Sequence, residues 1–176
     1  AVDNGGAQIN KISIADGTVT KYWVAPEYPT VRCYSPPAVA GYYVYFLTAK
    51  NVGMYNEMYL TRVNIYTGVG TNTHIGDAWA FFGGVVTDGT YLYMTGSNVS
   101  RVKKWRISDY HEEWDVATSG TGSLYCDCRG YVWDQANSSY QFRRITTADG
   151  AVAGFSGPGY YCFPGICSTG YVLPVS

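Results

Sequence analysis

The chain has 176 residues and a formal net charge of −1, and only 14% of its residues are charged, well below the usual share of about a quarter. The near-zero charge argues against a nucleic-acid binder, which needs a basic surface to release counterions. No apolar run approaches the ~18 residues of a membrane-spanning helix. With 21 Gly, 18 Tyr and 16% aromatic residues, the composition is unlike that of a disordered chain and favours strands joined by tight turns.

Four nine-residue segments along the chain align without gaps. Each has an apolar residue, a cation two positions later and a turn signal at its end, and an Asp-Gly pair in that place is typical of a hairpin. The segments are "INKISIADG" from Ile9, "LTRVNIYTG" from Leu60, "VKKWRISDY" from Val102 and "FRRITTADG" from Phe142. Each predicts a strand, a turn and a following strand.

A second element, Gly followed by Tyr and apolar residues, stands ahead of the last three segments. Its copies are "GYYVYF" at Gly41, "GTYLYM" at Gly89, "GYVWDQ" at Gly130 and "GYVLPV" at Gly170. The last copy has no cation segment after it, and the first cation segment has no Gly-Tyr element before it. The chain is therefore expected to begin and end within a repeat, and the absence of Met before Ala1 is compatible with a processed, mature chain.

Successive cation segments begin 40 to 51 residues apart, and strand-rich repeats of about 40–50 residues are typical of propeller blades. Over its whole length the sequence resembles the β-propellers. The resemblance implies an all-β fold, a single four-bladed propeller over residues 1–176, closed by pairing of the N- and C-terminal strands. The implied blades are 158–176 plus 1–25, then 31–77, 79–118 and 119–157. A β-sandwich or another repeat array is the alternative fold.

Within each implied blade, the Gly-Tyr element starts the second strand, the cation segment is the third strand, and the outer fourth strand follows the turn. Ring closure predicts that the segment around Lys11 pairs with the segment around Val172, which would also cover two open edges. The longest repeat contains "AKNVGMYNE", Ala49 to Glu57, which predicts an inserted loop between the second and third strands.

The aligned cations form a predicted ring whose members are Lys11, Arg62, Lys104 and Arg144. One interpretation is a ring of positive charge for an anionic partner. The favoured one is structural: each cation lies along the neighbouring blade and stacks on a recurring tyrosine, a contact of about 0.5–2 kcal/mol. The recurring tyrosines are Tyr43, Tyr91, Tyr131 and Tyr171.

Five cysteines and a low charge favour an oxidising, extracellular setting. The cysteines are Cys33, Cys126, Cys128, Cys162 and Cys167. Disulfides, buried thiols and a zinc site made from the last four are all possible, although the C-x-C spacing suits zinc poorly. Because the number is odd, at least one thiol is unpaired within a monomer. Asn98 and Asn137 lie in glycosylation sequons, and no cofactor is expected.

Catalytic motifs are absent from the sequence: it contains no H-E-x-x-H, G-x-S-x-G or P-loop. "HEEWD", from His111 to Asp115, groups an imidazole with three carboxylates and could bind a metal or supply an acid–base pair. It also begins an outer strand, where solvated charges are expected.

Exposed aromatic residues are the stronger functional indication. Those in or just after the predicted outer strands are Tyr22, Trp23, Trp79, Trp114 and Phe155, and Tyr55 lies in the predicted loop. Some must pack between blades; the others could dock a protein subunit or stack on sugars.

These features predict a non-enzymatic structural or interaction module that docks other protein subunits, in a homo- or hetero-oligomeric assembly, on an extracellular or cell surface or on a virus particle. In composition the chain resembles viral coat and tail proteins or surface proteins of thermophilic microbes. The alternative is a glycan-binding lectin with sites between blades, and a hydrolase using Asp115 ranks third.

Overall fold

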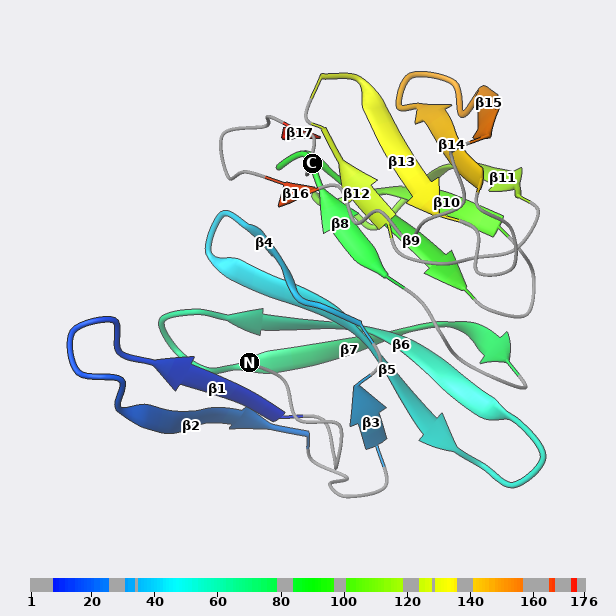
Figure 1. Cartoon of the computed structure of the whole chain (residues 1–176). Coiled ribbons are helices and arrows are strands. Elements are labelled where there is room, and N and C mark those ends of the chain that lie inside the picture. Colours follow the sequence, from blue (N-terminus) through cyan, green and yellow to red (C-terminus); the bar gives the residue numbers. More distant parts are fainter. Residues whose placement is uncertain are drawn as a thin grey trace. The chain divides into compact units, whose positions relative to one another are not determined.

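The structure is a computed structural model that describes residues 8–25, 31–33, 35–78, 84–96, 101–118, 124–127, 129–135, 141–156, 165–166 and 172–173. The chain divides into an N-terminal unit, Ala1–Phe81, and a C-terminal unit, Phe82–Ser176. Every described element is a β-strand (Figure 1). Within these ranges there is no helix long and apolar enough to cross a membrane.

The N-terminal unit contains a five-stranded antiparallel sheet and a separate hairpin. The hairpin is β1 (Gln8–Ile12) with β2 (Val19–Val24). The sheet has the order β3-β5-β6-β7, with β4 also paired to β5. Its strands are β3 (Val31–Cys33), β4 (Ala38–Ala40), β5 (Tyr43–Asn51), β6 (Asn56–Asn64) and β7 (Gly70–Ala78).

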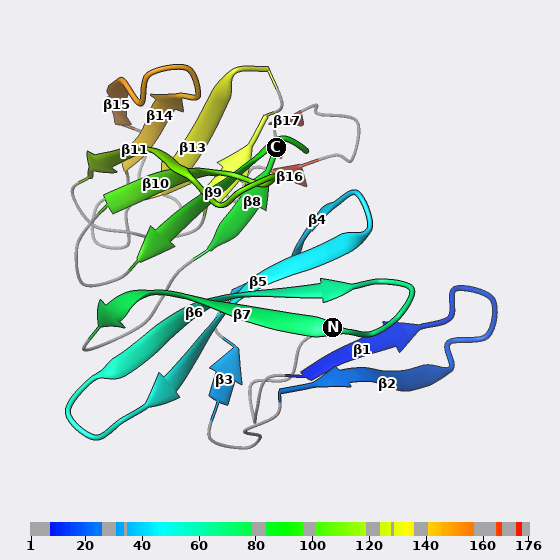
Figure 2. The ribbon, with the colours of Figure 1, turned by 180° about the vertical axis from the view of Figure 1, so that it is seen from behind.

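The predicted loop at Ala49–Glu57 is wrong, because most of these residues extend the β5–β6 ladder. Ala49 pairs with Met58, Lys50 with Glu57, and Asn51 with Asn56. The extra length therefore gives β5 and β6 nine residues each, and only the tight turn of residues 52–55 lies outside the strands. Figure 2 shows this long hairpin pointing away from the turns that join β4 to β5 and β6 to β7.

The first strand of this sheet is split into β3 and β4 by Pro36 and Pro37, which have no backbone N–H to donate to a ladder. The buried hydroxyl of Ser35 fills part of the interruption, since its Oγ accepts a 2.9 Å hydrogen bond from the Leu47 backbone N–H. A side chain thus replaces one backbone acceptor at the break.

The C-terminal unit contains two four-stranded antiparallel sheets and one short strand pair. The first sheet is β8 (Val85–Thr87), β9 (Tyr91–Gly96), β10 (Arg101–Arg106) and β11 (Glu112–Ala117). The second is β12 (Leu124–Cys126), β13 (Tyr131–Gln135), β14 (Gln141–Thr146) and β15 (Val152–Ser156). The short pair is β16 (Gly165–Ile166) with β17 (Val172–Leu173).

The predicted order of strands within a repeat is confirmed in all three large sheets. The Gly-Tyr elements begin the second strands β5, β9 and β13, the cations lie on the third strands β6, β10 and β14, and β7, β11 and β15 follow as fourth strands. The turn between the third and fourth strands ends in a left-handed residue, for example Gly68 with φ 70° and Gly150 with φ 75°. In the third repeat Tyr110 adopts this conformation, with φ 57°.

Each unit has its own apolar core. In the C-terminal unit the two sheets both contribute buried side chains: Tyr93, Val102, Leu124, Cys126, Val132 and Ile145. In the N-terminal unit the β1–β2 hairpin packs on the large sheet through Ile9, Ala25, Phe46 and Val63. Adjacent sheets within a unit thus bury a shared face, as stacked repeats must.

The described strands contain no closed sheet. β1 pairs with β2 and β17 pairs with β16, so the predicted ladder between the segments of Lys11 and Val172 is not observed among them. All-β architecture with antiparallel four-stranded repeats is confirmed; the four-blade count and the ring closure are not.

Candidate functional site

The four aligned cations all lie against tyrosine rings, but the predicted partner is wrong. In the three large sheets each cation contacts the tyrosine of its own second strand, not one on a neighbouring sheet. The cation-to-centroid distances are 4.7 Å for Arg62–Tyr43, 3.8 Å for Lys104–Tyr91 and 4.5 Å for Arg144–Tyr131. Tyr171 lies outside the described residues, and Lys11 instead approaches Tyr22 of β2 at 6.0 Å.

This contact is built by the antiparallel register. Arg62 pairs directly with Tyr45, Lys104 with Tyr93, and Arg144 with Trp133. The stacked tyrosine stands two residues earlier on the same strand, which makes it the diagonal cross-strand neighbour within reach of a long side chain. The cations therefore serve sheet stability in this geometry.

Lys104 and Trp114 join the two large sheets of the C-terminal unit. Lys104 Nζ and Trp114 Nε1 donate hydrogen bonds of 2.7 Å and 3.2 Å to the carbonyl oxygen of Thr147, which follows β14. A Cβ on Gly150 would lie 2.6 Å from Val116 Cγ1 and 3.2 Å from Trp114 Cδ2. The ring of Trp114, a predicted binding residue, is thus packed between sheets.

Trp23 has a similar position in the N-terminal unit. Its ring lies edge-on to Phe46 with centroids 5.6 Å apart, and a Cβ on Gly70 of β7 would come within 2.3 Å of Trp23 Nε1. Its neighbour Tyr22 packs against the same core. Both residues hold the β1–β2 hairpin on the large sheet, which is the packing alternative considered for the outer aromatics.

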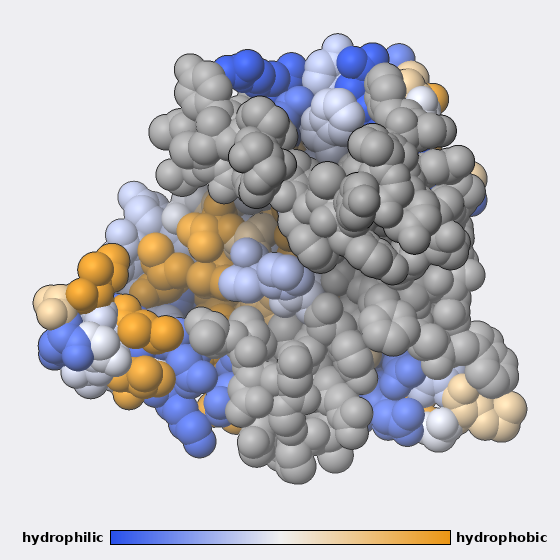
Figure 3. All heavy atoms as spheres, in the orientation of Figure 1, coloured by the Kyte–Doolittle hydropathy of each residue, from blue (hydrophilic) through white to orange (hydrophobic). Residues whose placement is uncertain are grey.

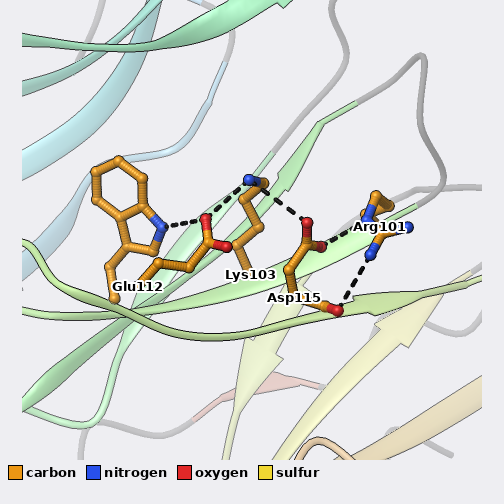
Figure 4. A network of polar contacts seen from close by, with 5 residues as sticks. Arg101, Lys103, Glu112 and Asp115 are labelled. Atoms are coloured by element: carbon orange, nitrogen blue, oxygen red, sulfur yellow. Dashed lines mark hydrogen bonds and ion pairs between the residues drawn. The ribbon is translucent and has the colours of Figure 1, made fainter.

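The acidic segment His111–Asp115 faces the basic strand β10 and forms ion pairs with it (Figure 4). Arg101 Nε lies 2.7 Å from Asp115 Oδ1, and Lys103 Nζ lies 2.8 Å from Glu112 Oε2 and 3.5 Å from Asp115 Oδ2. Burial of the ammonium opposes its charging, but the hydrogen bond to Glu112 and the charge of Asp115 raise the pKa of Lys103.

The same strand pair holds two further polar contacts. Trp105 Nε1 donates to Glu112 Oε2 at 3.1 Å. Arg106 bonds to Glu113 and, at 3.0 Å, to Asp109. The acid–base interpretation of this segment therefore has no support, because its carboxylates neutralise the cations opposite. In the ranges that the structure describes, no three His, Cys, Asp or Glu side chains are grouped to hold a metal ion.

Two aspartates that the sequence analysis overlooked organise the turns before second strands. Asp88 Oδ1 accepts from the backbone of Thr90 and Tyr91, and its Oδ2 accepts from Tyr93 Oη at 2.7 Å. Asp127 repeats the pattern, with Trp133 Nε1 as its 3.2 Å side-chain donor. The sequence does carry a signal for these turns: an Asp stands one or three residues before the glycine of the Gly-Tyr element.

Exposed large apolar side chains are concentrated in the N-terminal unit. Among the described residues, only Val152 of the eleven lies in the C-terminal unit. Seven lie in or next to the β1–β2, β4–β5 and β6–β7 turns, and these three turns point toward the same side of the N-terminal unit in Figures 1 and 2. This turn-end surface consists of Ile12, Ile14, Val19, Val39, Tyr42, Tyr66 and Val69. Figure 3 shows hydrophobic residues on this side of the unit.

The most exposed members of the turn-end surface are in the turns themselves: Ile14 is 103% exposed, Tyr66 71%, Val69 66% and Tyr42 63%. Tyr42 and Tyr66 face each other edge-on with centroids 5.4 Å apart. Tyr55, a predicted binding residue, lies at the opposite tip of the β5–β6 hairpin beside exposed Met54. These apolar side chains are exposed and do not pack in the core, so they are candidates for contacts with another molecule.

Several predicted sites lie outside the described residues or side chains. They are Trp79, Phe155, Cys33, Cys128, Cys162, Cys167, Asn98 and Asn137. Cys126 is described and buried at the end of β12, and the described side chains contain no disulfide. The disulfide, zinc and glycosylation interpretations stay predictions.

Comparison with known proteins identifies the fold alone. No protein-family model and no curated protein matches the sequence. Among solved structures, regucalcin, a calcium-binding protein from Agrobacterium tumefaciens, superposes with a TM-score of 0.63 at 16% identity, covering 90% of this chain and 56% of that one. A structure of a nidogen/laminin complex superposes with a TM-score of 0.62 at 11% identity, covering 87% of this chain and 59% of that one.

An oligogalacturonate lyase in complex with manganese gives a TM-score of 0.57 at 12% identity, covering 82% of this chain and 46% of that one. The chain thus spans about half the length of these structures. They are β-propellers, and this chain has the same type of fold. Because they include an enzyme and a member of a protein complex, the fold does not decide the activity.

Proposed function

We propose that the chain is a non-enzymatic β-propeller module that docks protein subunits, other copies of this chain among them. The observation that carries the proposal is the turn-end surface of the N-terminal unit, where seven apolar side chains, a tyrosine pair among them, are exposed, whereas the described part of the C-terminal unit exposes only Val152. At the positions equivalent to Tyr42 and Tyr66, the C-terminal unit has Thr90 and Ser108 in its first sheet and Gly130 and Ala148 in its second. An exposed apolar patch of this kind is typical of a protein-binding site.

The charged groups of the described chain support a non-enzymatic role. The carboxylates of Glu112 and Asp115 and the cations opposite them are engaged in ion pairs, which leaves Asp115 poorly placed as a general base. No cofactor is proposed. The nidogen/laminin complex shows that a related propeller fold occurs in a protein assembly.

The proposed module is a four-bladed ring. The β16–β17 and β1–β2 pairs are each two-stranded, and together they would supply the first, second, third and fourth strands of one blade, from residues 158–176 and 1–25. We place the module on an extracellular or cell surface or a virus particle, because its low charge, its cysteines and the sequons at Asn98 and Asn137 suit that setting.

Light scattering over a wide concentration range tests the docking proposal. We expect the chain to form oligomers or particles, and the triple variant Ile14→Ser, Tyr42→Ser, Tyr66→Ser to stay smaller at every concentration. Val152→Ser, at the exposed apolar residue of the C-terminal unit, is the matched control and should behave as the original chain. A monomer at all concentrations, unaltered by the triple variant, contradicts the proposal.

Glycan binding is the second candidate, favoured by one observation. Tyr42 and Tyr66 present two exposed rings at an interplanar angle of 62°, a corner on which a sugar ring could stack. A glycan array distinguishes the two functions: saturable binding that is lost in Tyr42→Ala and kept in Tyr55→Ala favours the lectin, and no hit together with concentration-dependent assembly favours protein docking.

A further inference from the structure

Tyr42 and Tyr66 lie in two neighbouring turns of the N-terminal unit and present their rings to each other. The ring centroids are 5.4 Å apart at an interplanar angle of 62°, so the edge of one ring contacts the face of the other. The two side chains are 63% and 71% exposed. A dissolved oxidant can therefore reach both phenols of this pair, whereas it cannot reach the ring of a buried tyrosine.

The backbone fixes the place of both rings. The Ile65 N–H donates a 2.9 Å hydrogen bond to the carbonyl oxygen of Tyr42, which joins the β4–β5 turn to the β6–β7 turn. Asn64 Oδ1 accepts bonds of 2.9 Å and 3.0 Å from the backbone N–H groups of Tyr66 and Thr67. Because exposed side chains change rotamer within nanoseconds, the two rings can alter their mutual angle while the turns keep them adjacent.

The same backbone bond recurs in both large sheets of the C-terminal unit, but without the phenols. There the carbonyl oxygen belongs to Thr90 or to Gly130, and the positions equivalent to Tyr66 hold Ser108 and Ala148. The repeat thus places two side chains next to each other in every large sheet. Only the sheet of the N-terminal unit, among these three, has a tyrosine at both places.

We propose that Tyr42 and Tyr66 form a site of oxidative cross-linking, at which a peroxidase-type one-electron oxidant joins the two rings as dityrosine. Each phenol gives up one electron and one proton and becomes a phenoxyl radical. The radicals couple through ring carbons ortho to the oxygens, and the hydrogen on each of these carbons moves to a phenolic oxygen, which restores both phenols. With hydrogen peroxide as the electron acceptor, the two electrons and two protons that leave convert one peroxide molecule into two molecules of water.

The new bond would close the open end of the β5–β6 hairpin. Tyr42 directly precedes β5 and Tyr66 lies two residues after β6, at the end opposite the turn of residues 52–55. The bond therefore links the two strands where the hairpin can fray. A cross-link that closes a loop restricts the unfolded chain more than the folded one, so the modified hairpin should be harder to open.

Oxidation of the full chain at high dilution tests the site. A peroxidase and hydrogen peroxide are added, the protein is digested with trypsin, and mass spectrometry identifies peptides that are joined with the loss of two hydrogen atoms. We expect a monomer in which peptide 33–50 is joined to peptide 63–101. Tyr42→Phe and Tyr66→Phe should each lose this product, because a phenylalanine ring cannot form a phenoxyl radical. Joined peptides that persist in either variant, or dityrosine found only in covalent dimers, overturn the proposal.

Tyr55 provides the matched control, because its ring is 41% exposed at the far tip of the same hairpin. Tyr55→Phe should keep the joined peptides, and their loss in this variant overturns the assignment. Urea denaturation is the second readout: the oxidised original chain should unfold at a higher midpoint than the unoxidised chain, and oxidised Tyr66→Phe should show no such rise. An equal rise in that variant overturns the link. The docking function is tested separately, since the cross-link forms within one chain.

Discussion

Lys104 Nζ donates a 2.7 Å hydrogen bond to the carbonyl oxygen of Thr147, 43 residues further along the chain. The same ammonium lies 3.8 Å from the centroid of Tyr91. One side chain thus stabilises its own sheet through a cation–π contact and fastens that sheet to the next through a charged hydrogen bond. Arg62 and Arg144 make the same kind of ring contact, with Tyr43 and Tyr131 of their own second strands.

Replacing Lys104 with methionine should destabilise the C-terminal unit. Lys104→Met keeps most of the apolar stem but removes the bond to Thr147 and the contact with Tyr91, for an expected loss of about 2–4 kcal/mol in the free energy of unfolding. Urea denaturation followed by fluorescence measures it. Lys103→Met, on the opposite, half-exposed face of the same strand, is the control and should cost about 0–1 kcal/mol. Equal losses would show that the inter-sheet bond is unimportant.

Gly150→Ala should be more damaging than a chemically identical change in an open turn. Gly150 has φ 75° and Gly17 has φ 71°, so alanine is strained in both by about 1–2 kcal/mol. At Gly150 the new methyl group also meets Val116 and Trp114, whereas nothing lies within 4 Å at Gly17. We expect Gly150→Ala to cost about 1–3 kcal/mol more, measured as the difference between the two unfolding free energies.

Asp134 and Arg143 form a buried ion pair between β13 and β14, with side-chain exposures of 0% and 5%. Removing one partner leaves the other charge buried without its counter-charge, so Asp134→Leu alone should cost about 3–5 kcal/mol in the free energy of unfolding. The double variant Asp134→Leu, Arg143→Met removes both charges and should recover most of this loss. A double-mutant cycle of unfolding free energies measures the coupling, and simple additivity would argue against a buried, interacting pair.

The stability of the protein should fall at alkaline pH partly through Tyr93. Burial, the hydrogen bond to Asp88 and the charge of that carboxylate raise the pKa of Tyr93 above its ordinary value of 10.0. Because the folded state favours the neutral phenol, this stabilisation is complete below the unfolded pKa of about 10 and is lost as pH rises through the folded value. Unfolding free energies measured from neutral pH upward should decline less steeply for Tyr93→Phe than for the original chain. Tyr66→Phe, at an exposed ring, is the matched control for the loss of one phenol.

The sequence predicted the order of strands within each sheet, because the patterns that indicate a hairpin lie within a few residues of one another. Gly-Tyr elements, alternating residues and the turn signals after the cations placed the second, third and fourth strands of each sheet, because hairpin pairing depends on neighbouring residues and on the turn between them. The inserted segment Ala49–Glu57 was wrongly predicted to be a loop. It lengthens the paired strands β5 and β6, and such pairing between strands cannot be read from a single stretch of sequence.

Only the tertiary structure showed which residues far apart in the chain contact one another. The sequence identified the four cations and the outer aromatics, but the register chose the tyrosine that each cation contacts, and sheet-to-sheet packing gave Trp23 and Trp114 structural positions. The exposed turn-end surface around Tyr42 and Tyr66 also emerged only when separate turns came together. Periodicity and turn chemistry act over a few residues and can be read directly, whereas packing partners and exposure depend on how sheets stack across tens of residues.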